Sequence, residues 1–217
     1  MGREETKQPY RVSFTFGGLL RAETEVLVQL YHELGDWQAV REKAVSEGQL
    51  GKTRRSSAFR YFREIRDRLS AAYEWELSVL GATKGAEGGK EADYPAVLLA
   101  ITARYYPLVG EFLRDLVRER MMYGPRVLES HVVRAFVSER ALEHSELERT
   151  SDSTRDKLRS VLMRITREAG IAVGRREPYE LTHPRMSDEL RDRYCRRGSA
   201  TDLYNLLLSD KEIAACR

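Results

Sequence analysis

A mainly α-helical fold is predicted by three features of this 217-residue sequence. Apolar residues recur at intervals of three and four along most of the chain, the spacing that gives a helix one buried face. A Gly-Asp pair at positions 35–36 separates two such stretches, as in a helix-turn-helix. Residues 171–182 instead read as two short strands around a turn. We therefore expect a helical bundle core, helix-turn-helix-like or winged-helix-like N- and C-terminal parts, and one short C-terminal β-hairpin.

The first expected module covers residues 1–81. It opens with a short extended segment, 11–16, before its helices begin. Gly35 is expected to end the first helix, since glycine tolerates positive φ, and Asp36 is expected to cap the second. The expected helices cover 19–34, 37–47 and a third stretch that is capped by Ser56 or Ser57 and ends at Leu80.

Three further segments follow. Residues 82–93 are rich in glycine and predict a flexible loop. Residues 94–149 are the most apolar and predict a central helical hub, interrupted at Pro107 and at 123–125. Residues 150–217 predict a winged-helix-like module with a helical tail.

Within this last segment, a helix is expected over 153–169, ending at Gly170. Its N-terminal cap is expected at Thr150, Ser151 or Asp152. The expected hairpin follows at once, with a Gly-Arg-Arg turn at 174–176. A helix followed by a basic hairpin is typical of a winged helix.

The formal net charge is only +3, so any affinity for nucleic acid must come from local clusters of cations. Residues 52–68 and residues 153–176 each hold seven Lys or Arg and only two Asp or Glu. Each cluster coincides with an expected recognition helix. The residues that we expect to contact nucleic acid are Lys52, Arg54, Arg55 and Arg60 in the first cluster, and Lys157, Ser160, Arg164, Arg167, Arg175 and Arg176 in the second.

The second cluster is the stronger candidate. Lys157, Ser160, Arg164 and Arg167 follow one another at steps of three and four residues, opposite an apolar stripe. One face would then pack inward while the other offers cations to phosphates. The alternative is that both clusters are ordinary solvated surfaces with ion pairs along the helices. Two clusters at corresponding positions favour nucleic acid.

No catalytic chemistry is indicated. The segment 48–53, GQLGKT, resembles a phosphate-binding loop but has Ser46 where that motif needs glycine. The four histidines show no metal-ligand spacing, and no nucleophile motif occurs. We therefore predict a non-enzymatic protein without a cofactor, a metal or a small-molecule substrate.

Location is predicted from the cysteines and from hydropathy. Cys195 and Cys216 are too few for a disulfide framework, so reduced thiols and a cytoplasmic protein are expected. The longest apolar run, 96–101, is far shorter than a membrane span needs. No membrane association is expected.

The order of several short motifs resembles the BrxA family of bacterial BREX phage-defence systems. These motifs are SFTFGGLL at 13–20, GDW at 35–37, REIRDRL at 63–69, TRDKLR at 154–159 and EAG at 168–170. The resemblance implies a helical fold with winged-helix features, sometimes likened to NusB, and double-stranded DNA binding. It also implies larger partners in the defence system, including a methyltransferase and ATPases. It supplies no catalytic motif.

The sequence thus predicts an accessory protein that binds double-stranded DNA through two basic clusters. Two alternatives stay open at this point: an adaptor that binds acidic proteins of the defence complex, and an RNA-binding protein like NusB. An enzyme with dispersed catalytic residues would be a third.

Overall fold

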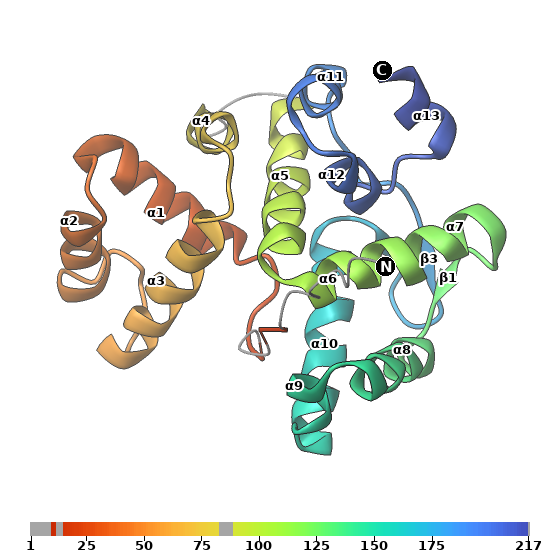
Figure 1. Ribbon diagram of the computed structural model, residues 1–217. Helices are drawn as coiled ribbons and strands as arrows, with labels where there is room; N and C mark the ends of the chain where they lie inside the picture. Colours follow the sequence, from red (N-terminus) through yellow and green to blue (C-terminus); the bar gives the residue numbers. More distant parts are fainter. Residues whose placement is uncertain (1–9, 12–14, 83–88, 217) are drawn as a thin grey trace, which may run out of the picture.

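The computed structural model describes residues 10–11, 15–82 and 89–216 and shows a mainly helical protein (Figure 1). Helices α1 to α4 form one side of the molecule in this view. Helix α5 lies between them and the remaining helices, so it occupies the centre. Part of the expected extended segment, residues 12–14, lies outside the described residues.

The turn between the first two helices forms as expected. Helix α1 (Arg21–Leu34) ends at Gly35, whose φ of 68° is in the left-handed region and whose N–H donates to the Tyr31 carbonyl. The Asp36 carboxylate accepts the Ala39 N–H at 2.8 Å and so caps α2 (Trp37–Arg41). The same run continues as a π-helical turn, η1 (Glu42–Ser46).

The third expected helix is wrong in its length. It divides into α3 (Arg55–Leu69) and α4 (Glu74–Ala82). Hydrogen bonds fix the chain between these two helices. The Tyr73 N–H donates to the Glu76 carboxylate at 2.7 Å, and Arg104 of another helix donates to the Ala71 carbonyl. The expected cap at Ser56 or Ser57 is also wrong, because α3 begins before both serines, at Arg55, and has no side-chain cap.

The central helices form the most buried part of the molecule. Helix α5 (Gly89–Tyr105) already covers part of the expected 82–93 loop, of which residues 83–88 lie outside the described range. Pro107 begins the next helical run, where its missing N–H costs nothing. That run consists of α6 (Pro107–Glu111), the π-helical turn η2 (Phe112–Arg118) and α7 (Glu119–Tyr123).

A small sheet joins the central and C-terminal segments. Its strands β1 (Val127–Leu128), β2 (Ala172–Val173) and β3 (Tyr179–Leu181) are arranged in the order β1-β3-β2, all antiparallel. The expected C-terminal hairpin is therefore confirmed, with Ala172 opposite Leu181 and Val173 opposite Glu180. Strand β1 was not expected, because a strand of two residues is too short to show alternating apolar and polar residues in the sequence.

Helices α8 (Ser130–Glu143), α9 (Ser145–Glu148) and α10 (Asp152–Glu168) lie together below the central run in Figure 1. Helix α10 packs along α8. Of the three caps considered for α10, the structure selects Ser151, whose hydroxyl accepts the Thr154 N–H at 3.3 Å. Gly170 follows with a φ of 71°, as its expected role at the helix end requires.

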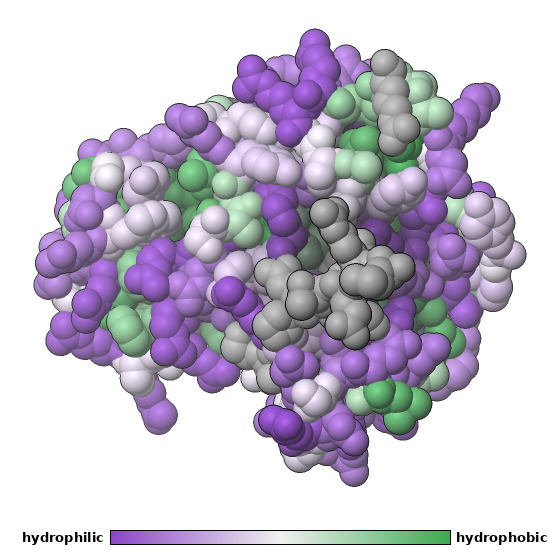
Figure 2. All heavy atoms as spheres, in the orientation of Figure 1, coloured by the Kyte–Doolittle hydropathy of each residue, from purple (hydrophilic) through white to green (hydrophobic). Residues whose placement is uncertain are grey.

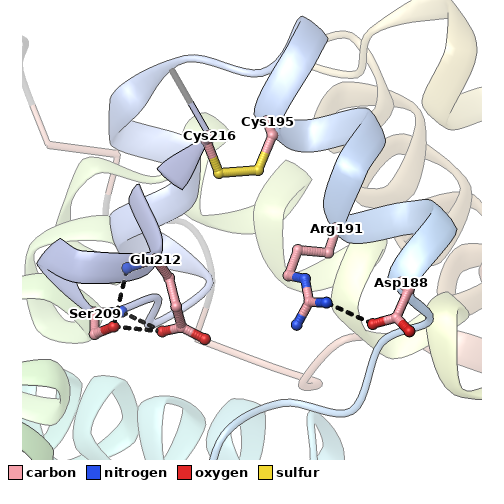
Figure 3. The surroundings of a disulfide bond; sticks show 6 residues. All are labelled: Asp188, Arg191, Cys195, Ser209, Glu212 and Cys216. Carbon is pink, nitrogen blue, oxygen red and sulfur yellow. Dashed lines mark hydrogen bonds and ion pairs between the residues drawn. A yellow bond between two sulfur atoms is a disulfide. The ribbon is translucent and has the colours of Figure 1, made fainter. Parts of the chain in front are cut away.

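The C-terminal tail consists of α11 (Asp188–Arg197), α12 (Ala200–Asn205) and α13 (Asp210–Ala215). The expectation of reduced cysteines is wrong: a disulfide joins Cys195 of α11 to Cys216 just after α13 (Figure 3). The two residues are 21 positions apart, yet the fold brings their Cα atoms to 4.9 Å. Spacing along the sequence gave no signal of this proximity.

Buried apolar residues from three of the expected segments, 1–81, 94–149 and 150–217, belong to one core, from Tyr10 near the N-terminus to Ile213 in α13. The division at residues 81, 93 and 149 stays a prediction. Figure 2 shows mostly hydrophilic residues on the visible face, with small separate hydrophobic areas.

Within the described residues, no single helix has the length and apolar character that a membrane crossing requires. Two consecutive helical stretches, Glu91–Tyr105 and Pro107–Tyr123, meet both criteria when they are taken together, but the chain bends by 119° between them.

Candidate nucleic-acid interface

Helix α10 has the two faces that its sequence predicts. Leu158, Leu162 and Ile165 are fully buried against the core. The four residues expected to face a ligand are all exposed, and they are Lys157, Ser160, Arg164 and Arg167. The amphipathic pattern therefore places a row of polar and cationic side chains on the surface.

The hairpin lies beside this exposed row and forms a groove with it. The groove has a volume of about 630 Å³. Helix α10 contributes Ser160, Arg164 and Arg167 to its lining, and the hairpin contributes Gly174 and Tyr179. The helix and the hairpin that follows it thus line one concave surface.

Local contacts hold two of the polar side chains that line the groove, Arg167 and Ser160. The Arg167 guanidinium lies 5.0 Å from the centre of the Tyr179 ring, a cation–π contact between helix and hairpin. The Ser160 hydroxyl donates to the Asp156 carbonyl one turn earlier, at 2.8 Å. Arg164 forms no ion pair with any residue that the structure describes. Its charge is therefore available to a ligand.

Lys157, Arg175 and Arg176 lie outside the lining of the groove but on the same elements. Arg175 and Arg176 are exposed in the turn between β2 and β3, and Lys157 is exposed two turns before Arg164 on α10. None of the three forms an ion pair within the described part of the chain. They add exposed cations next to the groove on both elements that line it.

Two carboxylates also line the groove, and both accept hydrogen bonds from the fold. Glu168 accepts the Leu19 N–H at 2.6 Å. Glu177 accepts the N–H of Ser130 at 2.7 Å and also its hydroxyl. These bonds from Ser130 lower the pKa of Glu177, so it stays ionised and caps the start of α8. The carboxylates therefore attach the groove to neighbouring elements.

Other cations of the second cluster are paired. Arg155 contacts Asp152 at 2.5 Å, and Arg159 contacts Asp156 at 3.5 Å. These pairs link residues three apart on α10, the arrangement of an ordinary solvated helix. The alternative of a paired surface thus holds for these two arginines, which were not among the expected contacts.

The first cluster does not form one cationic site. Lys52 pairs with Glu23 of α1 at 2.6 Å, and the Arg60 guanidinium lies 3.9 Å from the centre of the Phe16 ring. Arg54 is exposed just before α3, and Arg55 donates to the Ser46 hydroxyl at 2.9 Å. Lys52 is thus neutralised by Glu23, whereas Arg54, Arg55 and Arg60 are exposed.

The structure also reveals cations near the groove that the sequence analysis missed. A second hollow, of about 790 Å³, is lined by Arg185 and by Arg21, which pairs with Glu91 of the same lining at 3.2 Å. Val173 and Glu168 line both this hollow and the groove, so the two adjoin. No local pattern links Arg21 to Arg185, because they meet only through the fold.

These features define a mainly helical protein with an exposed cationic helix beside a basic hairpin. The family model BrxA matches residues 8–196, and the chain therefore belongs to the BrxA family. Membership of this family makes it a component of a BREX phage-defence system.

A similar fold occurs in a crystal structure of an uncharacterized protein from Magnetospirillum magneticum. The TM-score is 0.74 at 19% sequence identity, over 92% of this chain and 98% of that chain. At this identity the likeness concerns the fold alone. None of the curated proteins matches the sequence.

Proposed function

We propose that this protein is a non-enzymatic component of its defence system that binds double-stranded DNA through the groove between α10 and the β2–β3 hairpin. The observation that carries the proposal is the position of Arg164, Arg167 and Ser160 on one exposed face, beside a hairpin whose turn holds two further arginines. Cations on rigid elements bind phosphates, and a helix or a hairpin fits into a duplex groove.

A duplex suits the site because the cationic surface is supported by two different elements. Contacts from α10 and from the hairpin turn can reach phosphates on either side of a groove in DNA. Most hydrogen bonds in such interfaces go to the sugar–phosphate backbone, and these bonds carry no sequence information directly. We therefore propose that the contacts of this groove are mainly sequence-independent.

The choice of ligand is tested by competition. A labelled DNA duplex bound to the protein should be displaced by unlabelled duplex DNA at lower concentration than by duplex RNA. Stronger displacement by duplex RNA would favour the RNA-binding alternative. Absence of any salt-dependent binding, together with capture of acidic proteins of the defence complex, would favour the adaptor.

The paired substitution Arg164→Ala and Arg167→Ala is expected to weaken duplex binding by about tenfold. Each lost phosphate contact should also reduce the slope of log K against log salt by about 0.9. Fluorescence anisotropy of a labelled duplex at several salt concentrations measures both quantities. Both side chains are exposed, so the circular dichroism spectrum should not change.

The matched control is the pair Arg191→Ala and Arg193→Ala on α11. These arginines also lie on one helix, and they contact Asp188 at 2.5 Å and Glu189 at 3.2 Å (Figure 3 shows the first contact). The control removes the same charge from another surface and should leave duplex affinity nearly unchanged. Equal losses in both paired variants would show that affinity follows net charge rather than the groove.

A further inference from the structure

A separate hollow lies in the N-terminal helices, between the α2–η1 run and α3. Its volume is about 390 Å³, and its lining consists of Arg41, Val45, Arg55, Ser56 and Phe59. No carboxylate belongs to this set of described residues. The hollow therefore combines two cations and an aromatic ring on one surface.

Phe59 is unusual in its exposure. It is 39% exposed, whereas Phe62, three residues later on α3, is 2% exposed and packs in the core. Burial of a phenylalanine side chain contributes about 1.5–3 kcal/mol, so a ring left in solvent forgoes much of this stabilisation. The apolar face of α3 is complete without Phe59, since Ala58, Phe62 and Ile65 fill it.

The charges around this ring are accessible. The Arg41 guanidinium lies 5.2 Å from the centre of the Phe59 ring. Arg55 precedes Phe59 by one helical turn and donates to the Ser46 hydroxyl at 2.9 Å. Among the described residues, Arg41 and Arg55 take part in no ion pair. The hollow thus differs from the Lys52 site, where Glu23 cancels the charge.

We propose that this hollow binds an unpaired nucleotide of single-stranded DNA, with the base against Phe59 and the phosphates against Arg41 and Arg55. An aromatic ring beside cations is the arrangement with which single strands are bound, because every unstacked base offers a π face. A base inside a duplex has both faces covered by its neighbours. The hollow thus takes an unpaired base, whereas the groove at α10 takes a duplex, and the two sites share no lining residue.

The test uses Phe59→Trp as a reporter and oligothymidylate as the probe. Stacking of a thymine on the new indole should quench the added fluorescence, measured against the wild-type background of Trp37 and Trp75. Tyr123→Trp is the control, because Tyr123 is 74% exposed and lies in α7, away from this hollow. The control should not be quenched.

A second variant measures the contribution to affinity. Phe59→Leu should lower the affinity for oligothymidylate by about tenfold, as loss of one stacked base predicts. Its affinity for a blunt duplex should stay the same. In a protein that also carries Arg164→Ala and Arg167→Ala, Phe59→Leu should lower the affinity for oligothymidylate to the same extent. The result at Phe59 therefore does not depend on whether the groove at α10 binds a duplex.

Three results would overturn the inference: equal quenching of both tryptophan variants, unchanged oligothymidylate affinity in Phe59→Leu, or equal quenching of Phe59→Trp by polyglutamate. The last would show a site for acidic peptides. Since Phe59 is at the surface, its replacement should leave the circular dichroism spectrum unchanged, and that spectrum is recorded for each variant.

Discussion

Replacing Arg104 by methionine is expected to lower the free energy of unfolding by about 3–5 kcal/mol, the range for breaking a buried ion pair by removing one partner. Arg104 of α5 donates to both oxygens of Glu76, at 2.9 and 3.0 Å, and to Asp202 at 3.1 Å. The side chains of Glu76 and Asp202 are 0% and 1% exposed. Without the guanidinium, two buried carboxylates would lose their cation.

The same network orders four helical segments. The Tyr73 hydroxyl donates to Asp202 at 2.9 Å, and the Tyr194 hydroxyl donates to Glu76 at 2.7 Å. Burial, followed by the nearby Glu76 charge, raises the pKa of Tyr194 well above its usual value, so this phenol stays a donor. Arg104 thus connects α5 to the α3–α4 break, to α11 and to α12.

Urea denaturation measures the effect, with Arg191→Met as the matched control. Arg191 pairs with Asp188 at the surface, where such pairs contribute about 0–1 kcal/mol (Figure 3). The control should therefore unfold at nearly the wild-type midpoint. A loss in Arg104→Met as small as in the control would mean that the network is not a source of stability.

Gly18→Ala is expected to lower the free energy of unfolding by about 1–3 kcal/mol, the cost of a buried group that loses its hydrogen bond. A Cβ atom at position 18 would overlap the Glu168 carboxylate. Glu168 would have to turn away, and the buried Leu19 N–H would lose its acceptor. The Gly18 backbone cannot shift easily to make room for the methyl group, because its carbonyl accepts a hydrogen bond from the buried Arg68 guanidinium at 2.6 Å.

A double-mutant cycle with Glu168→Ala identifies the cause. Once the Glu168 carboxylate is absent, the methyl group at position 18 has room. The double variant should therefore lose less free energy of unfolding than the sum of the losses in the two single variants. Thermal or urea unfolding of the two single variants and the double variant gives the coupling. Additive losses would show that the overlap with Glu168 is not what destabilises Gly18→Ala.

Features determined by neighbours in the sequence could be predicted. Gly35 and Asp36 form a helix stop and a cap with atoms within four residues of themselves, and Ser151 caps α10 in the same local way. The two faces of α10 follow from its apolar period alone. The hairpin at 171–182 was visible because it is bounded by turn residues.

Features that depend on distant residues could not be predicted. The α3–α4 break needs Arg104, 33 residues beyond the Ala71 carbonyl to which it donates. Pairing of Lys52 with Glu23 spans 29 residues and neutralises one of the cations of the first cluster. The Cys195–Cys216 disulfide likewise depends on how α11 and α13 pack.

The candidate site was predicted in its composition but not in its shape. The exposure of Lys157, Arg164 and Arg167 follows from the helical period, and so does their common face. That the hairpin would lie close enough for Arg167 to contact Tyr179 does not follow from any local pattern. The capping of α8 by Glu177, which fixes the hairpin loop to the central helices, was also beyond the sequence.

The central claim is that the cations of α10 and of the hairpin turn neutralise DNA phosphates, and the salt dependence of duplex binding tests it most directly. The comparison is between the wild-type protein and a variant with Gln at the five positions Lys157, Arg164, Arg167, Arg175 and Arg176. If all five contact phosphates, the slope of log K against log salt should be less steep in the variant by about 4–5, at about 0.9 per contact. Equal slopes for the two proteins would contradict the account.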